Sequence, residues 1–214
     1  MTSIDTPVVE IATTEMMDGP MGRHGYVRTP RSRVVAAKDD PSLGAADVEA
    51  PQSIEQPKGF PAYEYTHKGQ VQHPPPDGKL MSAGIAAYSK LDGPVSPSGQ
   101  PWPAMQVTPG GTLRMSWWLT AQHKTEKWHY YITKDGWDQT KPLTRAMLEP
   151  LCTIHWHLDK STADWMSPFP VKDVQHWIKL PRKTGRHIIY CVWDVADTAN
   201  AFYQGTDVEF VASA

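Results

Sequence analysis

The sequence has no long apolar run and no excess of basic residues. No stretch of about 18 apolar residues occurs, so no transmembrane helix is predicted. The formal net charge is -2 over 214 residues, whereas proteins that bind nucleic acid or membrane surfaces usually carry a basic excess or stripe. We therefore expect neither nucleic acid nor a membrane as a partner. A chain of this length suits one domain, which we expect to be a monomer.

Cysteine is scarce, because Cys152 and Cys191 are the only two. Two cysteines are too few to define a disulfide scaffold, but one bridge is possible. The alternative is two buried thiols that pack as small apolar side chains. Their spacing leaves both alternatives open.

A recognisable secretion signal is also missing. Residues 1–23 have no basic start followed by an apolar run of about 7–15 residues, so they are not typical of a secretory signal peptide. We predict a leader over residues 1–23, disordered or removed, and a single domain over residues 24–212.

Long helical patterns are few, whereas proline is frequent at 20 residues. This composition favours strands and ordered loops over a helical bundle. Residues 36–105 are rich in Pro, Gly, Ser and Asp and are predicted to form a long loop region with short helices, one of them within 82–90. Residues 174–180 and 186–193 are predicted to form a hairpin around 181–185. With further strands at 112–117, 128–132 and 206–211, the pattern predicts an all-β antiparallel sandwich.

Nine histidines raise the question of a metal site. On a strand, His155, His157 and Asp159 would share one face over roughly 13 Å, which is too far to converge on one ion. We therefore favour a surface role for this group.

His24 would differ if it became the first residue of the chain. Its α-amino group and ring Nδ1 could then chelate one metal ion, and a second imidazole would complete a planar set of three nitrogens. Such a tetragonal nitrogen set suits Cu(II). Without cleavage this nitrogen is a peptide amide, and the chelate cannot form.

Four blocks of sequence give His24 a context. The chain resembles the chitin-binding type of bacterial and viral lytic polysaccharide monooxygenases, which is the chitin-binding type-4 domain family, over about residues 24–212. The blocks are His-Gly-Tyr-Val at 24–27 with Pro-Arg-Ser-Arg at 30–33; Pro-Gln-Ser-Ile-Glu at 51–55 with Lys-Gly-Phe-Pro at 58–61; Leu-Thr-Ala-Gln-His at 119–123 with Tyr-Tyr-Ile-Thr-Lys at 130–134, Gly-Trp-Asp at 136–138 and Pro-Leu-Thr-Arg at 142–145; and Val-Trp-Asp-Val-Ala-Asp-Thr-Ala-Asn-Ala-Phe-Tyr-Gln at 192–204.

The resemblance implies an immunoglobulin-like or fibronectin III-like sandwich with a flat face and a copper cofactor. His24 and His123 would bind copper, Phe202 would fill an axial position, and Ala121 would crowd the opposite approach. Glu55 would steer the oxygen species by hydrogen bonding. The remaining implied residues, Asp197 and Asn200, would lie on the substrate-binding face.

Two departures from the family pattern concern the substrate and the cysteines. Chitin-active relatives often have a Tyr-Glu pair where this chain has Glu49-Ala50, and we keep Glu49 as a candidate substrate-binding residue. Relatives also pair a cysteine near Cys152 with one at the position of Ile178. If Ile178 and Cys191 lie opposite each other in the predicted hairpin, a bridge between Cys152 and Cys191 could replace the usual one.

The resemblance implies copper-dependent oxidative cleavage of glycosidic bonds in a crystalline polysaccharide. Chitin is favoured and cellulose is possible. The reaction needs an external electron donor and O2 or H2O2. The resemblance also implies an extracellular protein, although the sequence shows no export route. The alternative is a chitin-binding or adhesion protein without turnover, as an unprocessed leader would produce.

Overall fold

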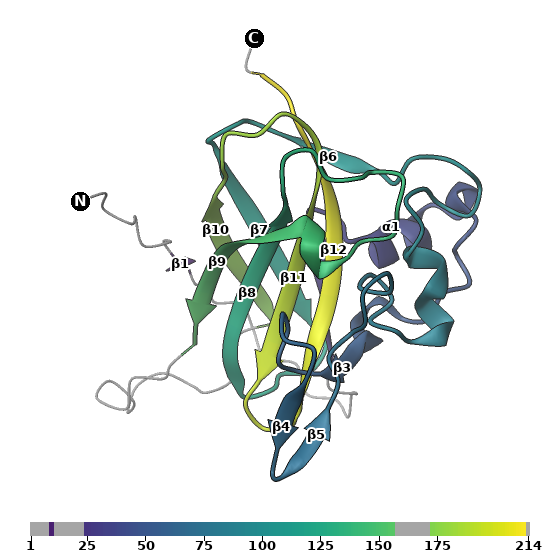
Figure 1. Ribbon diagram of the computed structural model, residues 1–214. Coiled ribbons are helices and arrows are strands. Elements are labelled where there is room, and N and C mark those ends of the chain that lie inside the picture. Colours follow the sequence, from purple (N-terminus) through teal and green to yellow (C-terminus); the bar gives the residue numbers. More distant parts are fainter. Residues whose placement is uncertain (1–8, 11–23, 157–171, 213–214) are drawn as a thin grey trace.

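The computed structural model describes residues 9–10, 24–156 and 172–212 of the chain. Two β-sheets pack face to face (Figure 1). The first has the order β1 (Val9–Glu10), β10 (Asp173–Lys179), β7 (Thr112–Leu119) and β2 (Gly25–Thr29). The second has the order β3 (Glu55–Pro57), β12 (Asn200–Phe210), β11 (Gly185–Val195), β8 (Thr125–Thr133) and β9 (Leu148–His155), and β6 (Ala104–Val107) also pairs with β12. The predicted all-β sandwich is confirmed.

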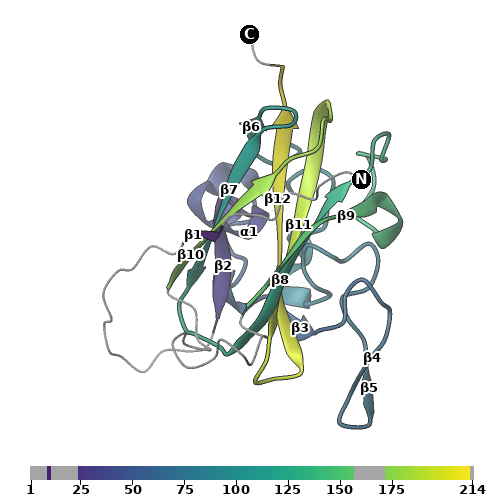
Figure 2. The same ribbon diagram turned by 90° about the vertical axis from the view of Figure 1, so that its left-hand side faces the viewer.

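The strands pair antiparallel, with the exception of β6, which runs parallel to β12. A separate two-stranded hairpin is formed by β4 (Tyr65–His67) and β5 (Gln70–Gln72). Figure 2 shows the two sheets from the side, with this hairpin at one end of the molecule. Within the described residues, no helix is long and apolar enough to cross a membrane.

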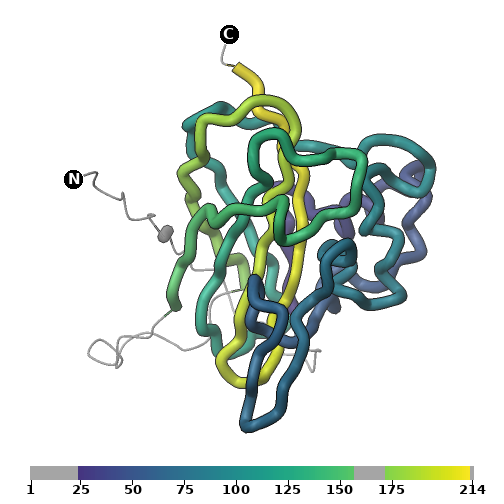
Figure 3. The backbone as a smooth tube through the Cα atoms, viewed as in Figure 1, coloured from purple at the N-terminus to yellow at the C-terminus, as the bar shows by residue number. Residues whose placement is uncertain are grey.

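The predicted long loop region does carry short helices. They are α1 (Arg33–Asp39), η1 (Pro41–Leu43), η2 (Pro51–Ser53) and η3 (Ala86–Leu91), and η4 (Arg145–Met147) follows β8. This region lies beside β12, as the tube in Figure 3 shows. The buried guanidinium of Arg33 fixes α1 to β12 through two hydrogen bonds to Asp207, of 2.7 and 3.1 Å.

Two apolar clusters form the core. One lies between the sheets and contains Trp117, Trp128 and Trp193, and the other lies between the second sheet and the loop region and contains Tyr190 and Tyr203. Residues 188–193 are all buried because β11 has one cluster on each face. Both clusters are made by residues 27–210, so a chain that begins at His24 keeps every residue of this core.

The predicted hairpin of residues 174–180 and 186–193 is wrong. β10 pairs with β7 in the first sheet, whereas β11 pairs with β8 and β12 in the second. Residues 181–184 therefore cross from one sheet to the other. Ile178 and Cys191 are both fully buried in the cluster between the sheets. They belong to opposite sheets that share this core, and not to neighbouring strands of one sheet.

The predicted bridge between Cys152 and Cys191 is also wrong, because both cysteines are free. Tyr130 is the register partner of Cys191 on one side and of Cys152 on the other. The cysteines are thus separated by the whole of β8, or roughly 10 Å at two interstrand spacings. A disulfide requires a Cα separation below about 7 Å. Burial raises the pKa of the Cys152 thiol to about 12, which makes it unreactive.

The predicted leader stays a prediction over most of its length, since residues 1–8 and 11–23 lie outside the described part of the chain. Val9 and Glu10 pair antiparallel with His176 and Gln175 at the edge of the first sheet.

Candidate functional site

The predicted site residues from four distant blocks meet at one end of the sandwich. His24 directly precedes β2, and its carbonyl accepts hydrogen bonds from Ala121 N (3.1 Å) and Thr120 Oγ1 (3.0 Å). These bonds fix His24 beside the turn that follows β7. Gly25 is required there, because a Cβ atom at this position would lie 2.6 Å from Leu119 Cδ2 and 2.9 Å from Trp193 Cζ3.

His123 lies in the same turn, before β8, and its side chain is 2 % exposed. Its ring Nδ1 lies 2.9 Å from Oδ1 of Asp197, which belongs to the turn between β11 and β12. A carboxylate on Nδ1 fixes both the tautomer and the orientation of a ring that binds a metal through Nε2. Sequence reasoning placed Asp197 on the binding face and missed this contact, which joins residues 74 positions apart.

Phe202 lies between the two histidines and the core. Its ring centroid is 5.7 Å from that of His24 and 5.6 Å from that of His123. Its other neighbour is Trp193, with centroids 4.9 Å apart and ring planes at 28°. Phe202 and Trp193 are register partners on β12 and β11, and both are fully buried. The two histidines therefore pack on buried aromatic side chains that exclude water.

Glu55 and Asn200 border the histidines on the other side. Glu55 on β3 is the register partner of Phe202, and its Oε1 accepts a hydrogen bond from Asn200 Nδ2 at 3.0 Å. Its other oxygen, Oε2, lies 4.0 Å from His24 Nδ1. One carboxylate oxygen is thus held in place while the other points toward His24.

The electrostatics of His24 favour a neutral ring. Burial lowers its pKa, and the positive charge that His123 can carry lowers it further, while Glu55 acts in the opposite direction. The Nδ1 atom of His24 is buried and, among the described residues, has no hydrogen-bond partner. A neutral imidazole with a buried nitrogen that lacks a partner can bind a metal without first losing a proton.

The side chains at this end of the sandwich do not by themselves provide enough ligands for a metal ion. Within the described residues, no group of three or more His, Cys, Asp and Glu side chains could hold a metal ion. Two imidazoles therefore need a further ligand of another kind, and a main-chain amine at His24 would be one. The residues present fit a copper ion on this condition.

The other candidate residues lie at the edge of this cluster or away from it. Ala121 is half-buried beside His24, whereas Glu49 is exposed in the segment before η2. His155 is exposed on β9, as expected for a surface residue, and His157 and Asp159 lie outside the described residues.

Three other histidines have structural partners in the core. The ring Nδ1 atoms of His129, His176 and His187 lie 3.0, 2.6 and 2.9 Å from Tyr131 Oη, Tyr130 Oη and Thr133 Oγ1.

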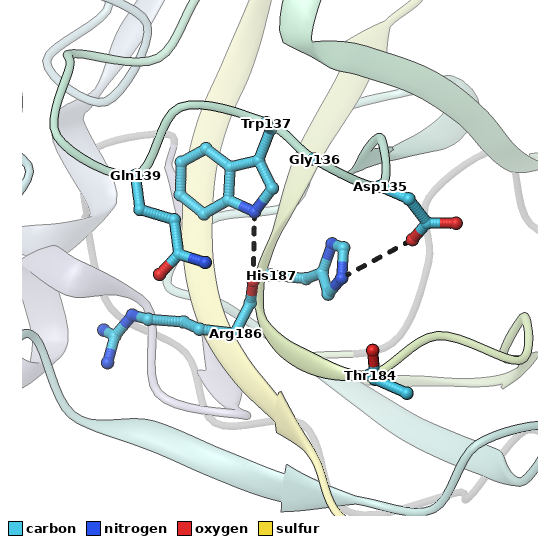
Figure 4. A pocket seen from close by; sticks show the side chains of 7 residues that line it. All are labelled: Asp135, Gly136, Trp137, Gln139, Thr184, Arg186 and His187. Atoms are coloured by element: carbon cyan, nitrogen blue, oxygen red, sulfur yellow. Dashed lines mark hydrogen bonds and ion pairs between the residues drawn. The ribbon is translucent and has the colours of Figure 1, made fainter.

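A polar pocket lies at the start of β11, where Arg186 and His187 help to line it (Figure 4). Trp137 Nε1 donates to the carbonyl of Arg186 at 3.0 Å, and His187 Nε2 lies 3.8 Å from Asp135. These contacts hold the turn after β8 against β11. The Gly-Trp-Asp block of the sequence thus has a structural role in this pocket.

Comparisons with known proteins agree with this geometry. The family described as "Lytic polysaccharide mono-oxygenase, cellulose-degrading" matches residues 24–208. GlcNAc-binding protein A of Shewanella oneidensis is 37% identical over 195 residues, which are 89% of this chain and 36% of that protein. The lytic chitin monooxygenase of Enterococcus faecalis is 36% identical over 191 residues, which are 86% of this chain and 84% of that protein.

Solved structures share the fold as well. A Bacillus amyloliquefaciens protein named CBM33, solved in complex with Cu(I), is 35% identical with a TM-score of 0.67, and the match covers 88% of this chain and 100% of that one. The chain spans only about a third of the length of GlcNAc-binding protein A and about half of a Mycosarcoma maydis relative. The match to the family begins at the same histidine that the cluster contains.

Proposed function

Because the chain belongs to the lytic polysaccharide mono-oxygenase family, with a match over residues 24–208, we propose that it cleaves glycosidic bonds in a crystalline polysaccharide by copper-dependent oxidation. The observation that carries this proposal is the pairing of His24 and His123 over the buried ring of Phe202. Copper at this site would supply the redox chemistry, drawing electrons from an external donor and using O2 or H2O2 to oxidise a C–H bond at the glycosidic linkage.

The copper ligands would be the α-amino group and Nδ1 of His24 and Nε2 of His123. This set requires that the chain be cut before His24, so that the leader, residues 1–23, is absent from the active form. The α-amino pKa is about 8 in the free state, and a metal charge lowers it so that the amine can bind in its neutral form. Asp197 would keep the His123 ring in the orientation that this requires.

The surrounding side chains would control access and hydrogen bonding. Phe202 would exclude water from the buried side of the two histidines, and Ala121 would crowd the approach to His24. Glu55, held by Asn200, would direct its second oxygen toward the reacting oxygen species and hold or accept a proton there. Asp197, Asn200 and Glu49 would contribute to the polysaccharide-binding face.

Chitin is the favoured substrate and cellulose is possible. A relative named lytic chitin monooxygenase supports chitin, whereas the family description names cellulose. Since these polysaccharides lie outside cells, we propose that the protein acts there.

The test uses a chain cut to begin at His24, loaded with copper and supplied with a reductant and crystalline chitin or cellulose. Mass spectrometry should detect oxidised oligosaccharides. His123→Ala should abolish their release, whereas His155→Ala, a change at an exposed histidine, should not. Product release that survives in His123→Ala would rule out this choice of ligand.

A second candidate is a chitin-binding protein without turnover. It is favoured by the name of the Shewanella oneidensis relative and by the fact that, in the uncut chain, the backbone nitrogen of His24 is a peptide amide. The mass of the protein from its native source separates the two candidates. A mass that corresponds to an N-terminus at His24 supports the enzyme, and a mass that includes residues 1–23 supports the binding protein.

A further inference from the structure

The β4–β5 hairpin pairs with neither sheet of the sandwich. In Figures 1 and 2 it projects at the same end of the molecule as the turn between β11 and β12, and it extends past that turn in both views. That turn carries Asp197, which holds His123. The hairpin is therefore placed at one edge of the proposed copper face.

A buried lysine ties the base of the hairpin to that turn. Lys58 is 6% exposed, and its Nζ donates to the carbonyl of Val195 at 2.7 Å. Its backbone N–H donates to the carbonyl of Ala199 at 3.0 Å. These two bonds hold the segment that leads into the hairpin against both ends of the β11–β12 turn, so the hairpin and the proposed copper face are continuous.

The first strand of the hairpin packs on the same segment. The Lys58 ammonium lies 5.9 Å from the ring centroid of Tyr65. Gly59 has φ +109°, and a Cβ atom there would come within 2.6 Å of Tyr65 Cβ, so only glycine allows this approach. Tyr65 also stacks with His67, with centroids 6.2 Å apart and planes at 27°. The hairpin is held in position before any ligand arrives.

The other face of the hairpin is exposed and nearly uncharged. Thr66 and Val71 are register partners, so their side chains share the face opposite that of Tyr65 and His67. Both are exposed, and the side chain of Val71 is 56% exposed. The only Lys, Arg, Asp or Glu residue in 65–72 is Lys68. One exposed valine beside neutral hydrogen-bonding side chains suits an uncharged glycan better than a charged protein partner.

We propose that the β4–β5 hairpin is a polysaccharide-binding element, which contacts the chain lying beside the one at the copper site through Thr66 and Val71. This inference rests on the proposed function and adds the residues that determine how the substrate is held. It also explains how the protein can bind a polysaccharide although Glu49-Ala50 stand where an aromatic residue was expected. Because the hairpin projects, it would favour the edge or step of a crystal over a wide flat face.

The test measures binding to crystalline chitin and crystalline cellulose by depletion isotherms, for the full chain and for a chain beginning at His24. One variant replaces Thr66–Val71 with Asn-Gly, so that Tyr65 and Gln72 close a two-residue turn. A milder variant, Val71→Ser, keeps the backbone. Val95→Ser is the matched control, because Val95 is a 45% exposed valine in the segment before β6. Copper affinity and thermal unfolding are measured for every variant.

We expect the shortened hairpin to raise the Kd for the preferred polysaccharide by about 10-fold or more and Val71→Ser to raise it by about 3-fold, with copper affinity unchanged. Val95→Ser should bind like the parent. If the shortened variant does not fold, the Kd of Val71→Ser alone tests the inference. If the folded hairpin variants bind the polysaccharide as tightly as the parent does, this inference is overturned and the proposed function is not. A parent that binds neither polysaccharide overturns the proposed function and this inference together.

Discussion

Acid should weaken the fold through one buried histidine on β10. His176 is fully buried, and its Nδ1 lies 2.6 Å from the hydroxyl oxygen of Tyr130. Trp117 Nε1 can only donate, and it donates to the same hydroxyl oxygen at 3.0 Å. The Tyr130 hydroxyl therefore donates its hydrogen bond to His176 Nδ1, which can accept it because the ring is neutral. Protonation of His176 would remove this acceptor and bury a charge.

The magnitude follows from the pKa of the two states. Burial lowers the pKa of His176 to about 3, whereas an unfolded histidine has a pKa of about 6.5. The unfolded chain thus binds the proton first, so this contribution to stability is complete above pH 6.5 and is lost as the pH falls toward 3. The free energy of unfolding should decrease by about 2 kcal/mol between pH 7.5 and pH 5 from this residue alone.

Urea unfolding at pH 7.5 and pH 5 measures this loss. His176→Leu should be less stable than the parent at pH 7.5 by about 1–3 kcal/mol, because the Tyr130 hydroxyl loses its acceptor. It should, however, lose about 2 kcal/mol less than the parent on going to pH 5. His155→Leu, at an exposed histidine on β9, should keep the parent's pH dependence. Equal losses in His176→Leu and the parent would refute the reasoning.

Three further predictions concern the metal ligands, the core and the cysteines. Asp197→Asn should weaken Cu(II) binding by about 10- to 100-fold in a calorimetric titration of the chain that begins at His24, and an unchanged affinity would remove the orienting role. Arg33→Met should lower the free energy of unfolding by about 1–3 kcal/mol, because the buried carboxylate of Asp207 then keeps only Arg186 as its partner. Arg31→Met, at an exposed pair, should cost about 1 kcal/mol or less. Thiol counting in denaturant without reductant should find two thiols per chain for Cys152 and Cys191, and a count near zero would restore the bridge.

The strands were predictable wherever one local pattern decided them. Alternation at 112–117 and the aromatic run at 128–132 predicted β7 and β8, and the structure extends both by a few residues. The run from Arg186 to Trp193 also predicted β11. It could not show that both faces of this strand are covered, because that depends on where residues 36–105 fold back.

The pairing of β10 was not predictable from its turn. Pro-Arg-Lys-Thr-Gly can connect two strands of one sheet or carry the chain across to the other sheet, and the choice depends on which apolar faces must meet. Ile178 and Cys191 are both buried in the cluster between the sheets, and β10 and β11 cover this cluster from opposite sides. The predicted disulfide depended on the hairpin and was wrong for the same reason.

The residues of the candidate site were predictable from the sequence blocks, but their contacts were not. Asp197 reaches His123 over 74 positions and Asn200 reaches Glu55 over 145. No local pattern carries such information. The hairpin at 65–72 was also missed, since its strands are only three residues long and no stronger strand pairs with them.

The central claim is that copper binds at His24 and His123 only when His24 begins the chain. Calorimetric titration with Cu(II) of two forms, the full chain and the chain cut before His24, tests it most directly. The cut form should bind one Cu(II) per chain far more tightly than the full chain, since only it has an α-amino group at His24. Equal affinities of the two forms would contradict the account.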